Sequence, residues 1–227
     1  MRRAVDGVIS TLLLLLCSPV LLGAALAIWL SDFGPVFFQQ ERAGLHNRSF
    51  RMFKFRSMRI NNLPVGDATE ASEIRSSHPL VTPVGRWIRR FKIDELPQLL
   101  NVLRGEMSLI GPRPTVPEQT AHYNSFELRR LDVPPGMTGW AQVNGGIELS
   151  WPERIMLDVW YVEHCSLWLD LRILARTIGV VLFGERAGTR ELDEAIEFAL
   201  GQSESASRKA DASALCPELP PRKCGNA

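Results

Sequence analysis

Two adjacent carboxylates, Asp94 and Glu95, are the residues of this 227-residue chain best suited to chemistry, because short basic motifs stand before and after them. Diphosphate oxygens need several fixed cations, a carboxylate site can hold Mg²⁺, and an ionised carboxylate can attack phosphorus. The pattern predicts phosphate chemistry, with Asp94 and Glu95 as catalytic and metal-binding residues. The expected substrate-binding residues are Lys54, Arg56, Arg86, Arg89 and Arg113.

The carboxylate pair opens a predicted helix, because the segment 94–97 places a proline in a first turn. The partial positive charge of a helix start favours ionised carboxylates. Ordinary helix capping is the alternative role of the pair. The apolar stripe of this helix, up to Gly105, consists of Leu96, Leu99, Leu100 and Leu103.

A small β-hairpin is expected to carry the first two cations. Its predicted strands are the segments 35–40 and 50–58, and in the second strand Lys54 and Arg56 alternate with two phenylalanines. Because side chains alternate across a strand, both cations point to one face. A sheet with one solvated face is the plainer interpretation.

The other cations come from a short helix and a stiff loop. In the predicted helix 85–91, Arg86, Arg89 and Arg90 are spaced at i, i+3 and i+4 and therefore share a face. Arg113 stands between two prolines, which disfavour helix and present the guanidinium from a rigid loop. A surface turn is the alternative for this loop.

Residues 7–31 carry no charge and are long enough for a membrane-spanning helix. Pro19 interrupts the stretch, so we expect two half-length helical segments that dip into the bilayer and return. The hydroxyl of Ser18 or Thr11 is expected to bond the carbonyl groups that the proline frees. Residues 1–32 are therefore predicted to be a re-entrant membrane anchor kinked at Ser18 and Pro19.

Basic residues flank the apolar stretch on both sides, and positive residues prefer the cytoplasmic side of a membrane. Both ends of the anchor are therefore expected in the cytoplasm. A secretory signal peptide and a kinked helix that crosses the bilayer are the alternatives.

Composition limits the remaining possibilities. A net charge of +1 gives no support for nucleic-acid binding, and the four cysteines show neither metal-ligand spacing nor a disulfide framework. Residues 33–190 are expected to form one cytoplasmic catalytic domain. Its apolar helices after Trp151 are either interfacial or buried in the core. Residues 191–227 are predicted to be a largely disordered C-terminal extension.

The sequence contains neither a nucleotide-binding P-loop nor a Ser/His/Asp pattern. Several motifs that follow one another between Arg2 and Gly184 make the prediction of phosphate chemistry more specific. The motifs include Arg-Arg-Ala-Val-Asp at 2–6, Ser18-Pro19, Phe53-Lys54-Phe55-Arg56-Ser57-Met58, Asp94-Glu95-Leu96-Pro97-Gln98-Leu99, Gly111-Pro112-Arg113-Pro114 and Pro135-Gly136-Met137-Thr138-Gly139-Trp140-Ala141-Gln142-Val143. On these motifs the chain resembles the bacterial sugar transferase family, the monotopic phosphoglycosyl transferases that begin glycoconjugate assembly on a polyprenol carrier.

The resemblance implies an α+β, mainly helical fold with a re-entrant helix hairpin, a small β-hairpin and interfacial amphipathic helices. It implies transfer of sugar-1-phosphate from a UDP-sugar to polyprenol (undecaprenyl) phosphate with release of UMP, as the first membrane step of glycoconjugate or polysaccharide synthesis. Asp94 matches the aspartate nucleophile that forms a covalent phosphosugar intermediate, Glu95 matches the neighbouring glutamate, and Mg²⁺ is the expected cofactor.

The expected partners are the UDP-sugar, the polyprenol phosphate and the bacterial inner membrane, with the catalytic domain facing the cytoplasm in a monotopic arrangement. A homodimer is left open as the oligomeric state. Because no further apolar stretch is long enough to span a bilayer, we expect the short form of the family, without an additional N-terminal membrane bundle.

Two departures from the family pattern remove a charge. Leu80 and Gly146 each stand where the family often has arginine, which affects sugar or nucleotide specificity more than the chemistry. Two rival functions are a membrane-surface phosphatase or pyrophosphatase, with water as acceptor, and a non-enzymatic scaffold that binds anionic lipids. Release of inorganic phosphate without a lipid product identifies the first rival, and tolerance of an Asp94 replacement identifies the second.

Overall fold

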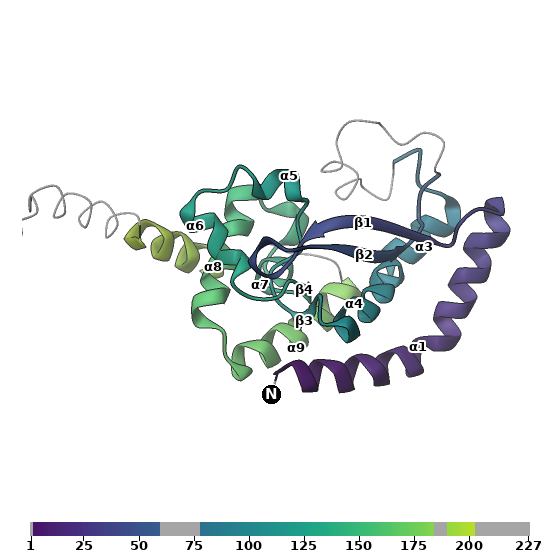
Figure 1. Ribbon diagram of the computed structural model, residues 1–227, viewed down its shortest axis with the longest axis horizontal. Coiled ribbons are helices and arrows are strands. Elements are labelled where there is room, and N and C mark those ends of the chain that lie inside the picture. The colour runs from purple at the N-terminus through teal and green to yellow at the C-terminus, as the bar shows by residue number, and fades with distance from the viewer. Residues whose placement is uncertain (1, 60–77, 184–189, 203–227) are drawn as a thin grey trace, which may run out of the picture.

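The computed structural model describes residues 2–59, 78–183 and 190–202, and it confirms a mainly helical fold with a small antiparallel strand pair (Figure 1). The strands are β1 (Phe37–Ala43), β2 (Ser49–Phe55), β3 (Ser108–Ile110) and β4 (Gly136–Thr138). The α-helices are α1 (Arg2–Asp32), α3 (Pro83–Arg90), α4 (Leu99–Arg104), α5 (Pro117–Thr120), α6 (Ser125–Leu128), α7 (Trp140–Val143), α8 (Trp151–His164) and α9 (Leu167–Phe183). Short 3₁₀ helices are η1 (Leu45–Asn47), η3 (Ile93–Gln98), η4 (Arg129–Leu131) and η5 (Gly146–Glu148).

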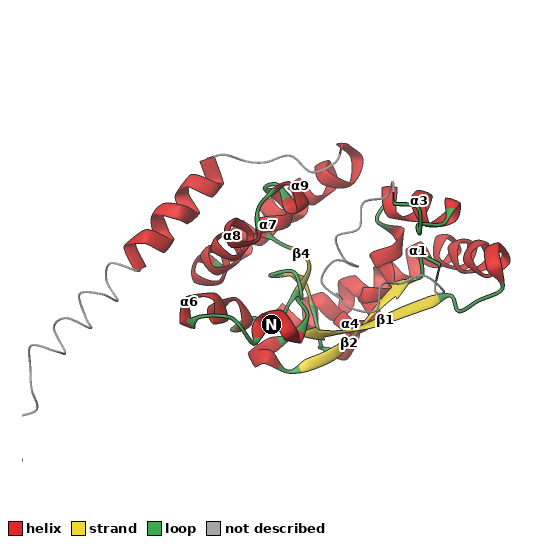
Figure 2. Cartoon of the chain, turned by 90° about the horizontal axis from the view of Figure 1, so that it is seen from above, coloured by secondary structure: helices red, strands yellow, loops and turns green. Residues whose placement is uncertain are grey.

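The predicted β-hairpin is present. Strands β1 and β2 pair in antiparallel register, with Phe37 opposite Phe55, and these two rings stack with centroids 5.4 Å apart. The turn between the strands is η1, where His46 and Asn47 have positive φ angles of 51° and 60°. Figure 2 shows the two strands next to each other, with α7, α8 and α9 on another side of the molecule. Strand β2 packs on η3, which brings the end of the hairpin to the predicted carboxylates.

Helix α1 is continuous from Arg2 to Asp32, so the predicted division into two separate segments is wrong. Figure 1 shows that the helix bends near its middle instead. Pro19 lacks the N–H that would donate to the carbonyl of Leu15, one turn earlier. The Ser18 hydroxyl donates to that same carbonyl at 2.8 Å, whereas Thr11 bonds the carbonyl of Gly7. Ser18 therefore supplies the hydrogen bond that the proline removes.

The two halves of α1 contact different hydrophobic clusters. Ile9 and Leu14 pack against a cluster built by β2, α4 and the segment around β3, while Ala24 and Ile28 belong to a cluster with α3 and η3. The bend therefore lets one helix cover both clusters. The rest of its apolar surface is exposed, and within the described ranges Arg2–Ser31 is the one helix long and apolar enough to cross a membrane.

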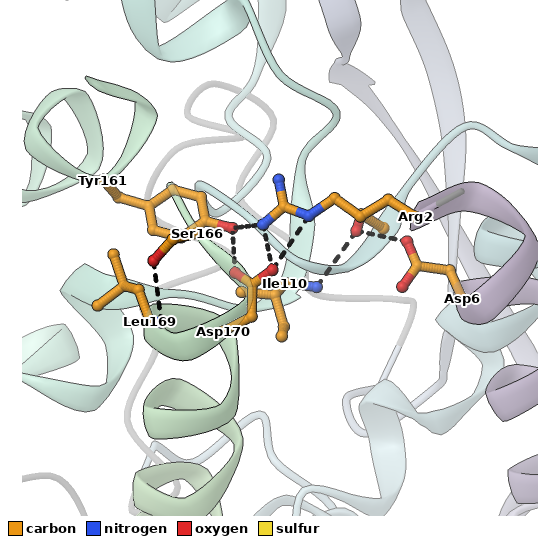
Figure 3. A network of polar contacts seen from close by, with 8 residues as sticks. Arg2, Asp6, Ile110, Tyr161, Ser166, Leu169 and Asp170 are labelled. Carbon is orange, nitrogen blue, oxygen red and sulfur yellow. Dashed lines mark hydrogen bonds and ion pairs between the residues drawn. The ribbon is translucent and has the colours of Figure 1, made fainter. Parts of the chain in front are cut away.

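The N-terminal end of α1 is fixed by polar contacts to distant parts of the chain (Figure 3). Arg2 donates from Nε to Asp170 Oδ2 at 3.0 Å and from Nη2 to the Tyr161 hydroxyl at 2.9 Å. That hydroxyl donates to Asp170 Oδ1 at 2.8 Å. One turn further along α1, Asp6 accepts a hydrogen bond from Ser108 at 2.7 Å. We refer to Arg2, Tyr161 and Asp170 as the N-terminal network; it joins α1 to α8 and α9.

A third hydrophobic cluster lies among α7, α8 and α9, with Trp140 at its centre. Residues 190–202 are helical and pack on this cluster through Ala195, which is fully buried. Glu191 of the same segment pairs with Arg172 and Arg176 of α9. The extension predicted from residue 191 therefore begins with a packed helix, and residues 203–227 lie outside the described part of the chain.

Candidate active site

Glu95 is the centre of the predicted cluster. Its Oε1 atom accepts hydrogen bonds from Lys54 Nζ at 3.2 Å and from Arg113 Nη2 at 2.8 Å. These three residues come from β2, η3 and the loop after β3. Burial alone would raise the pKa of Glu95, but the charges of Arg113 and Lys54 together lower it well below the usual range. Glu95 is therefore an ionised and firmly held carboxylate.

Asp94 lies next to Glu95 in the sequence, but its environment is different. It is 9% exposed, and among the described residues its carboxylate has no hydrogen bond or ion pair. Burial, and then the charge of Glu95, raise the pKa of Asp94 to about 6, although Lys54 and Arg89 act in the opposite direction. The expected preference of a helix start for ionised carboxylates is outweighed here by desolvation.

The local backbone explains how these carboxylates are presented. Lys92 has a left-handed conformation with φ 55°, which turns the chain from α3 into η3. The predicted single helix is in fact η3 followed by α4, which ends at Gly105 with φ 78°. Lys92 also adds positive charge beside both carboxylates, a role that the sequence analysis missed although it is only two residues before Asp94.

The predicted apolar stripe is wrong in two of its four positions, because Leu100 and Leu103 are exposed. The fully buried Asn101 lies on the core side of α4 instead. Its Oδ1 atom accepts from the backbone N–H of Phe53 at 3.0 Å, and its Nδ2 atom donates to the carbonyl of Arg51 at 2.8 Å. This amide binds α4 to β2 and so fixes Glu95 relative to Lys54.

The structure brings together three of the five predicted substrate-binding cations. Lys54 and Arg113 contact Glu95, and Arg89 is held near both carboxylates by a 2.8 Å hydrogen bond from its Nε atom to Ser57 Oγ. Arg56 instead packs its buried guanidinium against the backbone of Gly34. Arg86 is exposed on α3, and its side chain has no hydrogen bond or ion pair within the described residues.

A pocket beside this cluster was not predicted. Its empty volume, open mouth included, is about 710 Å³, and Arg113 belongs both to its wall and to the contact with Glu95. Asp158 is the one acidic residue of the wall, and it pairs with Arg130. The pocket is therefore positively charged. The basic residues that line it are Arg42, Lys92, Arg113, Arg130 and Arg154.

Sequence reasoning missed this pocket because its wall comes from segments far apart in the chain. Arg130 belongs to η4 and Arg154 to α8, and neither stands in a motif with a recognised spacing. Gln142, in the motif at 135–143, was the available signal.

The carboxylate pair suits Mg²⁺, which needs only one or two protein ligands, better than a metal ion whose ligands are all protein groups. Among the described residues, no group of three His, Cys, Asp or Glu side chains comes together. Mg²⁺ commonly takes one or two carboxylates and completes its shell with substrate phosphates and water. In the described part of the chain the carboxylate of Asp94 is buried without a paired cation, which matches that use.

The chain is similar to known sugar transferases over most of its length. The family model for bacterial sugar transferase matches residues 1–184. The undecaprenyl-phosphate glucose phosphotransferase of Komagataeibacter xylinus is 47% identical over 197 residues, which cover 82% of this chain and 36% of that protein. The UDP-glucose:undecaprenyl-phosphate glucose-1-phosphate transferase of Escherichia coli (strain K12) is 41% identical over 189 residues, covering 78% of this chain and 39% of that protein.

A further relative is similar in length to this chain. The uncharacterized sugar transferase EpsL of Bacillus subtilis (strain 168) is 42% identical over 185 residues, which cover 82% of this chain and 89% of that protein. The chain thus spans less than two fifths of the two relatives named for a glucose phosphate transfer, and most of the relative without an assigned activity.

Proposed function

The chain belongs to the bacterial sugar transferase family, and on that basis we propose that it transfers a sugar-1-phosphate from a UDP-sugar to undecaprenyl phosphate, with release of UMP. The observation that carries the proposal is the buried Asp94–Glu95 pair with Lys54, Arg89 and Arg113 gathered around it. Relatives named for glucose and for galactose phosphate transfer are both similar to this chain, so the sugar is left open.

The geometry supports a transfer in two steps. An oxygen of ionised Asp94 attacks the β-phosphorus of the donor, the bond from that phosphorus to the bridging oxygen breaks, and UMP leaves with the bridging oxygen. An oxygen of the lipid phosphate then attacks the same phosphorus, which forms a lipid diphosphate-sugar and frees the carboxylate. Asp94 suits the nucleophilic role because its carboxylate has no ion pair among the described residues and is unusually basic, whereas Glu95 is already held by two cations.

The surrounding cations stabilise negative charge as it spreads over the transferring phosphoryl oxygens. Glu95 holds Lys54 and Arg113 within 3.2 Å and thereby orients both toward the substrate. Asp94 and Glu95 would hold Mg²⁺, which when bound neutralises part of the diphosphate charge.

We also propose a monotopic arrangement in the bacterial inner membrane, with the catalytic domain in the cytoplasm. Figure 1 shows α9 and the N-terminal half of α1 at the same edge of the molecule, where Arg2 bonds Asp170, and α9 exposes Leu167, Trp168 and Phe183 by 71 to 78%. Two exposed apolar helices on the same side of the molecule favour one lipid-facing surface. Cysteine labelling from outside intact cells tests the topology, since residues 2 and 45 should both be protected; labelling of residue 2 alone would contradict a re-entrant helix.

The proposed reaction is tested by incubating membranes that contain the protein with radiolabelled UDP-sugars and undecaprenyl phosphate. Label should enter the lipid fraction for one of the sugars, and Asp94→Asn should abolish that transfer. Rapid quenching without lipid acceptor should add one sugar-phosphate mass to the peptide that contains Asp94. Release of inorganic phosphate without a labelled lipid would favour a phosphatase instead.

A further inference from the structure

The helix formed by residues 190–202, yellow in Figure 1, lies beyond the part of the chain that the family model matches. One face of it contacts the rest of the protein, because Glu191, Ala195 and Phe198 are spaced at i, i+4 and i+7. Ala195 is fully buried in the cluster among α7, α8 and α9. The ring of Phe198 meets the ring of His164, at the end of α8, edge-on with centroids 5.4 Å apart. We refer to this element as the C-terminal helix.

Glu191 is the polar contact of that face. Its Oε1 atom accepts hydrogen bonds from two arginines of α9, Arg176 and, at 3.3 Å, Arg172. Both guanidinium groups also lie over the ring of Trp140, 5.2 and 5.4 Å from its centroid. Burial acts to raise the pKa of Glu191, but the hydrogen bond from Arg176 and the charges of both arginines lower it. Glu191 is therefore ionised at neutral pH and holds both arginines.

Arg176 uses the two arms of its guanidinium group for different partners. Its Nη2 atom donates to Glu191, and its Nη1 atom donates to Oδ1 of Asn144. Asn144 is 1% exposed, and its Nδ2 atom donates to the carbonyl of Trp140 at 2.9 Å. Because a guanidinium group is planar and rigid, a partner that fixes one arm also fixes the other. Glu191 therefore restrains Asn144 from a separate helix.

Asn144 begins a turn that forms part of the wall of the basic pocket. Gly145 and Gly146 have positive φ angles of 141° and 51°, and two successive glycines give the backbone much freedom. Gly146 and Ile147 line the pocket. The far end of the turn is held by Arg154 of α8, which donates to the carbonyl of Ile147 at 3.3 Å. The near end is held through Asn144, so the shape of this wall depends on the contact between Asn144 and Arg176.

We propose that the C-terminal helix positions the active site, with Glu191 acting through Arg176 to set the conformation of the turn at residues 144–147. This inference rests on the proposed function, which makes the pocket wall part of the site that takes up the UDP-sugar. Neither Glu191 nor Arg176 lines the pocket, and within the described contacts neither bonds Asp94 or Glu95. Loss of the restraint should therefore raise the KM for the donor and leave kcat nearly unchanged.

Glu191→Gln tests the proposal with a change that nearly preserves the shape of the side chain. Glutamine lacks the negative charge that holds the two guanidinium groups, so the donor KM should rise by about fivefold, the usual effect of one hydrogen bond. The matched control is Glu194→Gln in the same helix, because the Glu194 side chain is 47% exposed and pairs with Arg190 one turn earlier. This control should leave the donor KM unchanged.

The two arginines of α9 provide a second matched pair of variants. Arg176→Lys keeps the charge but presents one nitrogen where the fork presents two, so it should raise the donor KM as Glu191→Gln does. Arg172→Lys is the control, because Arg172 also pairs with Glu191 but, among the described contacts, does not bond Asn144. Glu191→Gln combined with Arg176→Lys should raise the donor KM no further than either single variant, since both break the same contact to Asn144.

Hydrogen–deuterium exchange of the full-length protein in detergent measures the turn directly, without substrate. The backbone N–H of Glu148 donates to the carbonyl of Gly145 at 2.9 Å, so its exchange reports whether the turn keeps its shape. Exchange at this amide should be about fivefold faster in Glu191→Gln than in the wild type, and unchanged in Glu194→Gln. Unchanged exchange in Glu191→Gln would overturn the proposal and leave the C-terminal helix as a cover for the hydrophobic cluster.

The two measurements separate failure of the positioning role from failure of the proposed function. If no UDP-sugar labels the lipid while exchange at the turn depends on Glu191, the positioning of the turn is supported and the transfer is refuted. If lipid is labelled while the donor KM of Glu191→Gln equals that of the wild type, the transfer stands and the positioning role is refuted, whatever the exchange rate.

Discussion

Asp94 in the candidate site and Asp170 in the N-terminal network are both nearly buried, at 9% and 7% exposure, yet their surroundings differ completely. Both oxygens of Asp170 are bonded, one to the Tyr161 hydroxyl and the other to Arg2. The carboxylate of Asp94 has no hydrogen bond or ion pair within the described residues. Burial alone therefore does not distinguish the two carboxylates; their bonded partners do, and the proposed nucleophile is the one without them among the described residues.

The two aspartates also differ in their effect on the free energy of unfolding. The pKa of Asp94 rises from 3.8 to about 6, so its ionised form destabilises the folded protein by about 3 kcal/mol. Because the folded protein holds this proton more tightly than the unfolded chain, the stabilisation is complete below pH 4 and is lost as the pH rises through 6. At neutral pH, Asp94 weakens the fold, whereas the N-terminal network strengthens it.

The largest expected effect is that of Asp94→Asn. Asparagine removes the nucleophile and the buried charge together, so turnover should fall by at least about a thousandfold while the unfolding temperature rises. Thermal unfolding at pH 8 and at pH 4 should show that the gain in stability exists at the higher pH and disappears at the lower one. An asparagine variant that is less stable than the wild type at pH 8 would mean that Asp94 is paired after all.

Arg113→Lys should have the next largest effect. Lysine keeps the charge but loses the planar fork that can contact Glu95 and a phosphate together, so kcat/KM should fall by about ten- to a hundredfold with the fold intact. Arg86→Lys is the control, because the exposed Arg86 side chain makes no hydrogen bond or ion pair in the described structure. Near-normal activity of Arg113→Lys would contradict a phosphate-binding role for Arg113 and indicate that its loop is only a surface turn.

The activity of the wild type should decline in acid with a midpoint near pH 6. The attacking carboxylate must be ionised, so below this pH the rate should fall by about tenfold per pH unit, and above it the rate should level off. The profile is that of kcat/KM, which reports the free enzyme, taken from UMP release at donor concentrations well below KM between pH 4.5 and 8. A midpoint near pH 4 would show that Asp94 is as hydrated as an ordinary surface aspartate.

The sequence predicted the residues of the cluster better than their electrostatic environment. Lys54, Glu95 and Arg113 meet as expected because each stands in a rigid local motif. The pKa of Asp94 could not be predicted, since desolvation depends on side chains from distant segments. For the same reason, helical spacing placed Arg86 and Arg89 on one face without showing that only Arg89 contacts Ser57.

The fold shows the same division between local and long-range information. The β-hairpin and the compensation of Pro19 by Ser18 are encoded within a few residues, and both were expected. The continuity of α1 across Pro19 was not, because it depends on the packing of the two halves of the helix on two separate clusters. The pocket wall depends on α8, which begins more than fifty residues after Glu95.

Asp170→Asn should have the smallest effect on turnover. It should lower the stability of the protein, whereas Asp94→Asn should raise it. This change weakens the contact with Arg2 and one hydrogen bond to Tyr161, and because the Arg2 side chain is 43% exposed, we expect a loss of about 1 kcal/mol of unfolding free energy. Turnover should stay within about twofold, since none of these three residues lines the pocket and, among the described contacts, none bonds Glu95. Urea unfolding of Asp170→Asn, Tyr161→Phe and the double variant should give a non-additive result, because the two side chains share hydrogen bonds with each other and with Arg2. If Asp170→Asn instead lowers kcat at unchanged stability, α1 is coupled to the chemistry, and the contrast between a structural and a reactive carboxylate no longer holds.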